Sequence, residues 1–107
     1  LIRKGGKLEE LPPTGPLAAV FPGAEYAERA VRMEPGELLV CFTDGVTEAY
    51  AGGGELFGED KFMKLLSGIS SEPVEKICSL ISGAVLEYSA GELKDDVTVL
   101  ALRRNSL

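Results

Sequence analysis

The sequence predicts an α+β domain built on an antiparallel sheet, and three features of its second half lead to that prediction. An unbroken apolar run at Leu38–Phe42 has the length of a buried strand. Two consecutive stretches with apolar residues at helical spacing follow it, and a β-branched, apolar run at Val97–Leu102 comes last. Strand, two helices and strand in this order are typical of a layered α+β domain.

The residues before Leu38–Phe42 predict shorter strands and a hairpin. Arg3–Lys7 has the glycines of a turn and leads into an expected strand at Lys7–Leu11, after which prolines end regular structure. Glu25–Met33 alternates roughly between apolar and charged residues, and Glu34–Glu37 has the proline and glycine of a type II turn. We therefore expect Glu25–Met33 to pair with Leu38–Phe42. Because Leu38–Phe42 is apolar on both faces, we also expect both faces to be covered.

Both expected helices carry a continuous apolar stripe. In the first helix, the stripe consists of Phe62, Leu65, Leu66 and Ile69. The second helix starts near Ser71 and Pro73 and is ended by Gly91. Its stripe consists of Val74, Ile77, Cys78, Ile81, Val85 and Tyr88.

The composition of the chain excludes several classes of catalytic and binding site. The 107 residues carry a net charge of −6 and no histidine, which excludes a Ser-His-Asp triad and a histidine-ligated zinc site within this chain. The acidic balance argues against nucleic acid as a partner, and no apolar stretch is long enough to span a membrane. Cys41 and Cys78 lack metal or redox spacing, so we expect buried, reduced thiols of a cytoplasmic protein. Hydrolytic chemistry would rest on carboxylates, which suit Mg²⁺ or Mn²⁺.

Acidic residues stand at the ends of the two expected core strands. Asp44 follows Leu38–Phe42, and Asp95 and Asp96 precede the last strand. If these strands are antiparallel neighbours, Asp44 and Asp95 converge at one sheet edge, where a divalent cation would relieve their repulsion. The alternative is that both are turn aspartates whose carboxylates only accept backbone hydrogen bonds. Spacing leaves both interpretations open.

Longer motifs indicate a family. The stretch PGELLVCFTDGVTEAYAGGGELFGEDKFMKLL, followed after the helical region by KDDVTVLALRR, resembles the C-terminal half of metal-dependent (PPM, protein phosphatase two C-like) serine/threonine phosphatases of the SpoIIE/RsbU branch. The likeness extends from Gly15–Leu17 to Arg104. It identifies residues 1–107 as the C-terminal portion of one such domain, with the N-terminal half absent.

The resemblance implies a fold, a reaction and a set of site residues. The fold would be part of a sandwich of two antiparallel sheets flanked by helices. Asp44 and Asp95 would be ligands of two Mn²⁺ or Mg²⁺ ions, and Asp96 would lie beside them, near metal-bound water. Thr43, Gly45 and Thr47 would be structural, and Leu56–Gly58 would pack a loop against the core. The reaction would be hydrolysis of phosphoserine or phosphothreonine on a regulatory protein such as an anti-sigma-factor antagonist.

The sequence also departs from the family pattern. The aspartate ligands that the family carries in its N-terminal half are missing, and Ala18 stands where the family usually has glycine. Two aspartates cannot hold two octahedral ions, so we expect residues 1–107 alone to be inactive. An upstream half of the domain, and a sensor or receiver domain before it, are implied as partners. A non-catalytic phosphatase-like binding module and an inactive fragment are the alternatives.

Overall fold

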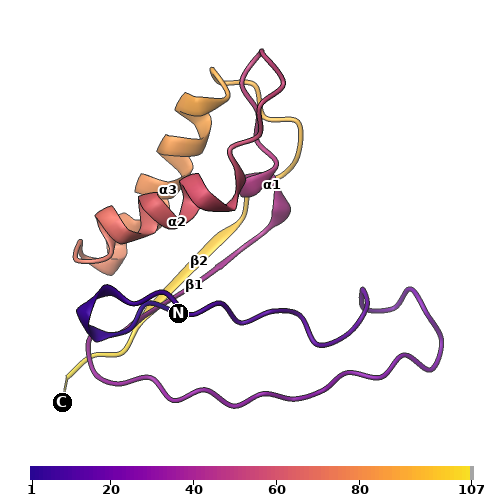
Figure 1. Cartoon of the computed structure of the whole chain (residues 1–107), viewed down its shortest axis with the longest axis vertical. Coiled ribbons are helices and arrows are strands. Elements are labelled where there is room, and N and C mark those ends of the chain that lie inside the picture. The colour runs from indigo at the N-terminus through magenta and orange to yellow at the C-terminus, as the bar shows by residue number, and fades with distance from the viewer. Residues whose placement is uncertain (107) are drawn as a thin grey trace.

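The centre of the structure is a two-stranded antiparallel sheet with two helices packed on one side of it (Figure 1). The computed structural model of the chain describes residues 1–106. Strands β1 (Leu38–Phe42) and β2 (Val99–Arg103) pair in a register that places Leu38 opposite Arg103. The elements around them are a short 3₁₀ turn η1 (Lys4–Gly6) before β1, and α1 (Asp44–Thr47), α2 (Gly58–Ile69) and α3 (Val74–Tyr88) between the strands. This order confirms the expected α+β class.

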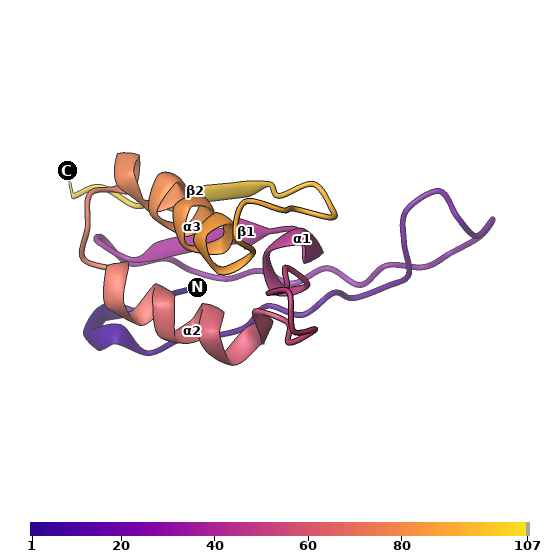
Figure 2. The same cartoon turned by 90° about the horizontal axis from the view of Figure 1, so that it is seen from above.

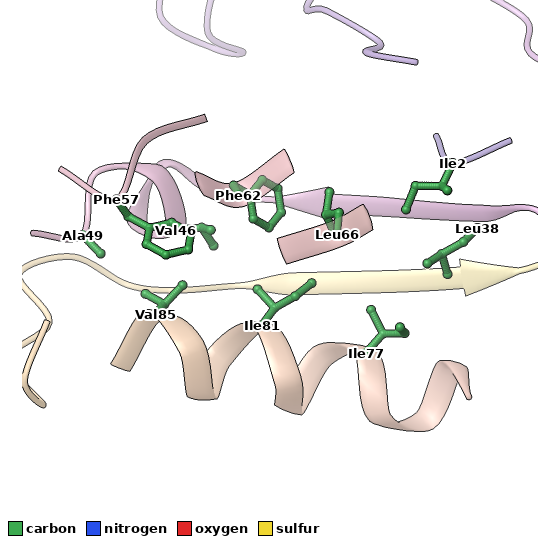
Figure 3. Packing of buried hydrophobic residues seen from close by; sticks show 10 residues of the cluster. All are labelled: Ile2, Leu38, Val46, Ala49, Phe57, Phe62, Leu66, Ile77, Ile81 and Val85. Carbon is green, nitrogen blue, oxygen red and sulfur yellow. The ribbon is translucent and has the colours of Figure 1, made fainter. Parts of the chain in front are cut away.

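The two helices form because each has an apolar stripe to bury, as the sequence predicts. In α3, Ile77, Ile81 and Val85 are completely buried and point toward the sheet (Figure 3). In α2, Phe62 and Leu66 are buried, and the Phe62 ring packs edge-on against Phe42 at a centroid distance of 4.5 Å. After α3, the backbone N–H of Gly91, whose φ is +83°, donates to the Leu86 carbonyl and closes the helix.

The opposite face of the sheet is not covered by the described residues. Side chains of Leu100 and Leu102 are 64% and 55% exposed, and Cys41, which lies opposite Leu100, is exposed too. The expectations of a strand covered on both faces and of a buried Cys41 are therefore wrong for this chain. The reason is that α2 and α3 lie on the same side of the sheet, and alternate strand residues point to opposite faces (Figure 2).

The expected hairpin between Glu25–Met33 and β1 is also wrong, because β1 pairs with β2 instead. Residues 11–33 form a projecting arm without helix or strand (Figure 1). Across this arm, the Thr14 hydroxyl donates to the Ala27 carbonyl at 2.6 Å, and the Tyr26 hydroxyl donates to the Leu17 carbonyl at 3.2 Å. The arm accounts for a radius of gyration of 15.4 Å, compared with about 13 Å for a compact domain of this length.

Two other segments differ from expectation in their extent. The predicted strand Lys7–Leu11 is reduced to single bridges that join Ile2 to Leu8 and to Leu38, so it adds no strand to the sheet. The last strand begins at Val99 rather than Val97. The turn at Glu34–Glu37 is as predicted, with Gly36 at a φ of +89° and the Glu37 N–H donating to the Glu34 carbonyl.

A buried carboxylate fastens the N-terminal residues to the start of β1. Glu37 is only 4% exposed, and its carboxylate accepts hydrogen bonds from the backbone N–H groups of Glu34 (2.8 Å) and Lys4 (3.3 Å) and from the Arg3 guanidinium (3.0 Å). Arg3 also forms an ion pair with Glu9 at 2.9 Å. These bonds favour the ionised carboxylate, so the pKa of Glu37 lies below its ordinary value of 4.5, chiefly because of the Glu34 N–H.

We predict that Glu37→Gln lowers the thermal unfolding temperature and makes it less sensitive to acid. A lowered pKa means that Glu37 contributes stability above its ordinary pKa, and that this contribution disappears as pH falls through the lower folded-state value. Unfolding temperatures measured between pH 7 and pH 3 should therefore converge for the two proteins at the acid end. Glu34→Gln, which changes an exposed side chain in the same turn, is the control and should have little effect.

Candidate functional site

A side-chain hydroxyl joins the two strand ends that carry the candidate site. The Thr43 hydroxyl donates to the Asp96 carbonyl at 3.2 Å and accepts the Thr98 N–H at 3.1 Å. The Thr43 N–H also donates to the Thr98 carbonyl at 3.1 Å. These three hydrogen bonds continue the pairing of β1 and β2 beyond Phe42. They place the residue before Asp44 directly against the segment that contains Asp96.

Gly45 completes this junction because a side chain would not fit there. A β-carbon at Gly45 would lie 2.1 Å from the Asp96 carbonyl oxygen, much closer than any non-bonded contact allows. The backbone at Gly45 is buried, as is Val46 beside it. The structure therefore accounts for the two residues that flank the aspartate of T-D-G. Thr43 bridges the strands, and Gly45 lets α1 approach the start of the opposite strand.

Asp44 itself is exposed and opens the four-residue helix α1, an element that the sequence did not predict. Its backbone carbonyl accepts the Glu48 N–H at 2.8 Å. Within residues 1–106 its carboxylate takes part in no hydrogen bond or ion pair, so the fold makes no use of this charge. The carboxylate also lines a groove of about 650 Å³ beside β1.

Asp95 and Asp96 lie on the exposed segment that leads into β2. The Asp95 carboxylate accepts the N–H of the next residue, Asp96, at 2.8 Å, which is a local bond and not a tertiary one. Asp96 takes part in the junction through its backbone carbonyl rather than its carboxylate. The strand pairing thus brings the Asp44 and Asp96 backbones together, and Asp95 is the next residue along the chain.

The donor atoms suit a hard divalent cation, but they are too few to enclose one. Carboxylate oxygens are the ligands that Mg²⁺ and Mn²⁺ prefer. In the described part of the chain, however, no group of three Asp, Glu, Cys or His side chains is arranged to hold a metal ion. The fit is therefore partial, and further ligands would have to come from outside residues 1–106.

The loop between α1 and α2 is held by an aromatic contact. Phe57 is buried and packs edge-on against Tyr88 at a centroid distance of 5.3 Å, as expected for a structural loop. The Tyr88 hydroxyl donates to the carbonyls of Glu55 and Leu56 at 3.1 and 3.3 Å. The role of Tyr88 and the part played by Thr98 were missed from the sequence. The threonine that follows Asp95 and Asp96 in the motif was the available signal for Thr98.

We predict that Gly45→Ala destabilises the chain by about 1–3 kcal/mol, because the added methyl forces the Asp96 segment away from α1. Chemical denaturation monitored by circular dichroism measures the change. Gly53→Ala is the matched control, since a β-carbon there meets no atom within 4 Å. Equal stability of the two variants would contradict the close approach described above.

Comparison with known proteins places these features in a family. The family model described as "Stage II sporulation protein E (SpoIIE)" matches residues 1–105. The chain is 30% identical to Protein IcfG of Synechocystis over 106 residues, and 26% identical to the phosphoserine phosphatase RsbU of Bacillus subtilis over 102 residues. These matches cover 98% and 95% of the chain but only 17% and 30% of the relatives.

A solved structure supports the same assignment. The SiaA-PP2C domain of Pseudomonas aeruginosa superposes with a TM-score of 0.64 at 26% identity, over 70% of this chain and 31% of that one. The chain therefore spans about a third or less of the proteins it matches. Among residues 1–106, no helix has the length and apolar character needed to cross a bilayer. With its T-D-G and D-D-x-T strand ends joined through Thr43, the chain belongs to the SpoIIE family of PPM-type phosphatases.

Proposed function

We propose that the chain is the C-terminal part of a metal-dependent protein serine/threonine phosphatase. In this proposal it removes phosphate from a serine or threonine of a regulatory protein, with an anti-sigma-factor antagonist as the substrate class. Family membership and the similarity to RsbU, a phosphoserine phosphatase by name, support the reaction. The observation that carries the proposal is the junction at Thr43, because it holds the Asp44 and Asp95–Asp96 segments at one edge of the sheet.

In the proposed site, Asp44 and Asp95 hold divalent ions and Asp96 lies beside them. Mn²⁺ or Mg²⁺ bound there would activate the attacking water and neutralise charge on the phosphoryl group. Asp44 suits this role because its carboxylate is exposed and takes part in no hydrogen bond or ion pair within residues 1–106. Asp95 would bind an ion through the carboxylate oxygen that does not accept the Asp96 N–H.

The remaining ligands and the rest of the sandwich would come from an upstream half of the same domain. The length of the matched relatives, of which this chain spans 17% and 30%, supports such a half. We further propose a cytoplasmic location and control by a sensor or receiver domain in the same protein. Both proposals follow from the role in signal transduction that the resemblance to the SpoIIE/RsbU branch implies.

A non-catalytic binding module is the second candidate. The observation in its favour is the absence, within residues 1–106, of any three acidic, cysteine or histidine side chains arranged to hold a metal ion. If the upstream half lacked ligands as well, the domain would bind a partner without hydrolysing phosphate. The two candidates differ in whether Asp44 and Asp95 affect turnover in the complete protein.

We predict that Asp44→Asn and Asp95→Asn each reduce phosphatase activity of the complete protein by about 100-fold or more, because each removes a charged ligand. Release of phosphate from a phosphoserine peptide in the presence of Mn²⁺ measures the change. Glu87→Gln, which neutralises an exposed carboxylate on α3, is the control and should retain full activity. Circular dichroism should show unchanged folding for all three variants, since within residues 1–106 neither aspartate side chain makes an ion pair or a hydrogen bond to a residue distant in sequence.

We predict that residues 1–107 alone release no phosphate under the same conditions. Two carboxylates leave most positions of two octahedral ions without protein ligands. The chain should therefore match its own Asp44→Ala/Asp95→Ala double variant at every Mn²⁺ concentration. Turnover above that double variant would show that this part of the domain is sufficient for catalysis and would refute the expectation.

A further inference from the structure

The segment that carries Asp95, between α3 and β2, is hydrogen-bonded at its two ends. At the α3 end, the Glu92 N–H donates at 3.1 Å to the carbonyl of the residue that follows α3. At the β2 end, the Asp96 carbonyl accepts the Thr43 hydroxyl. Among the described residues, no backbone N–H or carbonyl group of residues 93–95 has a hydrogen-bond partner. Backbone hydrogen bonds therefore do not fix the position of Asp95.

The Lys94 side chain joins this segment to a different loop. Its Nζ lies 4.3 Å from the centroid of the Tyr50 ring, within the range of a cation–π interaction. The chain bends at Lys94 and Asp95, so the contact is made by the residue directly before the carboxylate. Lys94 takes part in no ion pair within residues 1–106, which leaves the Tyr50 ring as the partner of its charge.

The ring is an informative partner because carboxylates are abundant at this end of the sheet. Residues 43–57 and 89–98 each contain three acidic residues, and Lys94 is the one basic residue in either segment. An exposed ion pair and an exposed cation–π contact have similar strengths, so the sequence does not decide between them. The structure places the ammonium group on the ring and leaves Asp95 and Asp96 without an ion pair within residues 1–106.

Tyr50 can restrain Lys94 because Tyr50 is itself well anchored. It forms a β-bridge with Leu56, whose carbonyl accepts the Tyr88 hydroxyl of α3 at 3.3 Å. The preceding residue, Ala49, is buried, and its carbonyl accepts the Phe57 N–H at 2.6 Å. The ring therefore stands on a part of the loop that is tied to α3 and to the core.

We infer that Tyr50 is a positioning residue, which acts through Lys94 to hold the Asp95 carboxylate in place. What Asp95 binds rests on the proposed function, whereas the way in which it is held rests on the contact with the ring. On the ring, the ammonium group is also kept from pairing with the neighbouring carboxylates, where it would repel a divalent ion. Because the restraint is an attraction between a cation and an aromatic face, it requires both partners and tolerates another aromatic ring or another cation.

Nuclear magnetic resonance of the complete protein, with its lysines dimethylated by isotope-labelled formaldehyde, tests the contact. A dimethylated lysine keeps its charge, and an aromatic face beside it shifts its methyl signal upfield. We expect an upfield signal that is absent from Lys94→Arg, which assigns it to Lys94. The shift should be lost in Tyr50→Leu and kept in Tyr50→Phe. A Lys94 signal that Tyr50→Leu leaves unchanged would overturn the inference.

Binding of Mn²⁺ to the complete protein, measured by calorimetry, tests the positioning. Tyr50→Leu and Lys94→Gln should each weaken binding about three- to fivefold. The double variant should bind no more weakly than either single one, because both remove the same contact. Tyr50→Phe and Lys94→Arg should bind Mn²⁺ as the unchanged protein does. Lys64→Gln, which neutralises an exposed lysine on α2, is the control and should have no effect.

The sign of the Lys94→Gln effect separates positioning from simple electrostatics. Loss of a positive charge would by itself strengthen the binding of a cation, so weaker binding indicates a lost restraint. Lys94→Gln changes an exposed side chain and therefore gives this answer even if Tyr50→Leu disturbs the loop. Stronger Mn²⁺ binding by Lys94→Gln, or equal losses in Tyr50→Leu and Tyr50→Phe, would overturn the inference.

Failure of this inference is distinguishable from failure of the proposed function. A complete protein that binds no Mn²⁺ at all would refute both. A complete protein that binds Mn²⁺ equally well with and without the Tyr50 ring and the Lys94 charge would refute the inference alone. Neither the resonance measurement nor the calorimetry depends on phosphatase activity.

Discussion

The arrangement of the candidate site depends on the bridge that Thr43 makes between the ends of β1 and β2. One hydroxyl serves as donor to the Asp96 carbonyl and acceptor of the Thr98 N–H. Both bonds are at the last point where the strands can pair, just before the chain turns into α1. Without them, only the hydrogen bond from the Thr43 N–H to the Thr98 carbonyl and the packing of Gly45 on the Asp96 carbonyl would hold the two strand ends together here. The relative position of two segments far apart in sequence therefore depends in large part on one neutral side chain.

The sequence was most informative where a physical constraint acts within a few residues. The helical stripes of α2 and α3 were predicted because Phe62, Leu66, Ile77 and Ile81 repeat at the period of a helix, and burial follows directly. The turn before β1 was predicted because Gly36 supplies a positive φ. The antiparallel pairing of Leu38–Phe42 with the last strand entered the sequence analysis only as a condition, and the pairing of β1 with β2 meets that condition.

Strand partners were predicted less well because pairing depends on which segments compete for an edge. Alternation in Glu25–Met33 indicated a strand, yet β2 takes one edge of β1 and Ile2 takes part of the other. An alternating pattern is equally compatible with an extended, exposed arm. The metal site could not be tested in the same way: no group of three possible ligand side chains within residues 1–106 is arranged to hold a metal ion, so the roles of Asp44, Asp95 and Asp96 stay predictions.

The close contact at Gly45 shows that two neighbouring residues of the T-D-G motif are kept for different reasons: Gly45 for folding and Asp44 for chemistry. The Asp96 carbonyl disfavours a β-carbon at Gly45 whatever the domain does, so a descendant that had lost all chemistry would still be destabilised by a larger residue there. The Asp44 carboxylate is under no such constraint, because within residues 1–106 it makes no hydrogen bond or ion pair. A related protein that had lost its activity could therefore replace Asp44 while it kept Gly45. The presence of Asp44 is therefore the part of the motif that bears on catalysis, whereas the presence of Gly45 reflects only the needs of the fold.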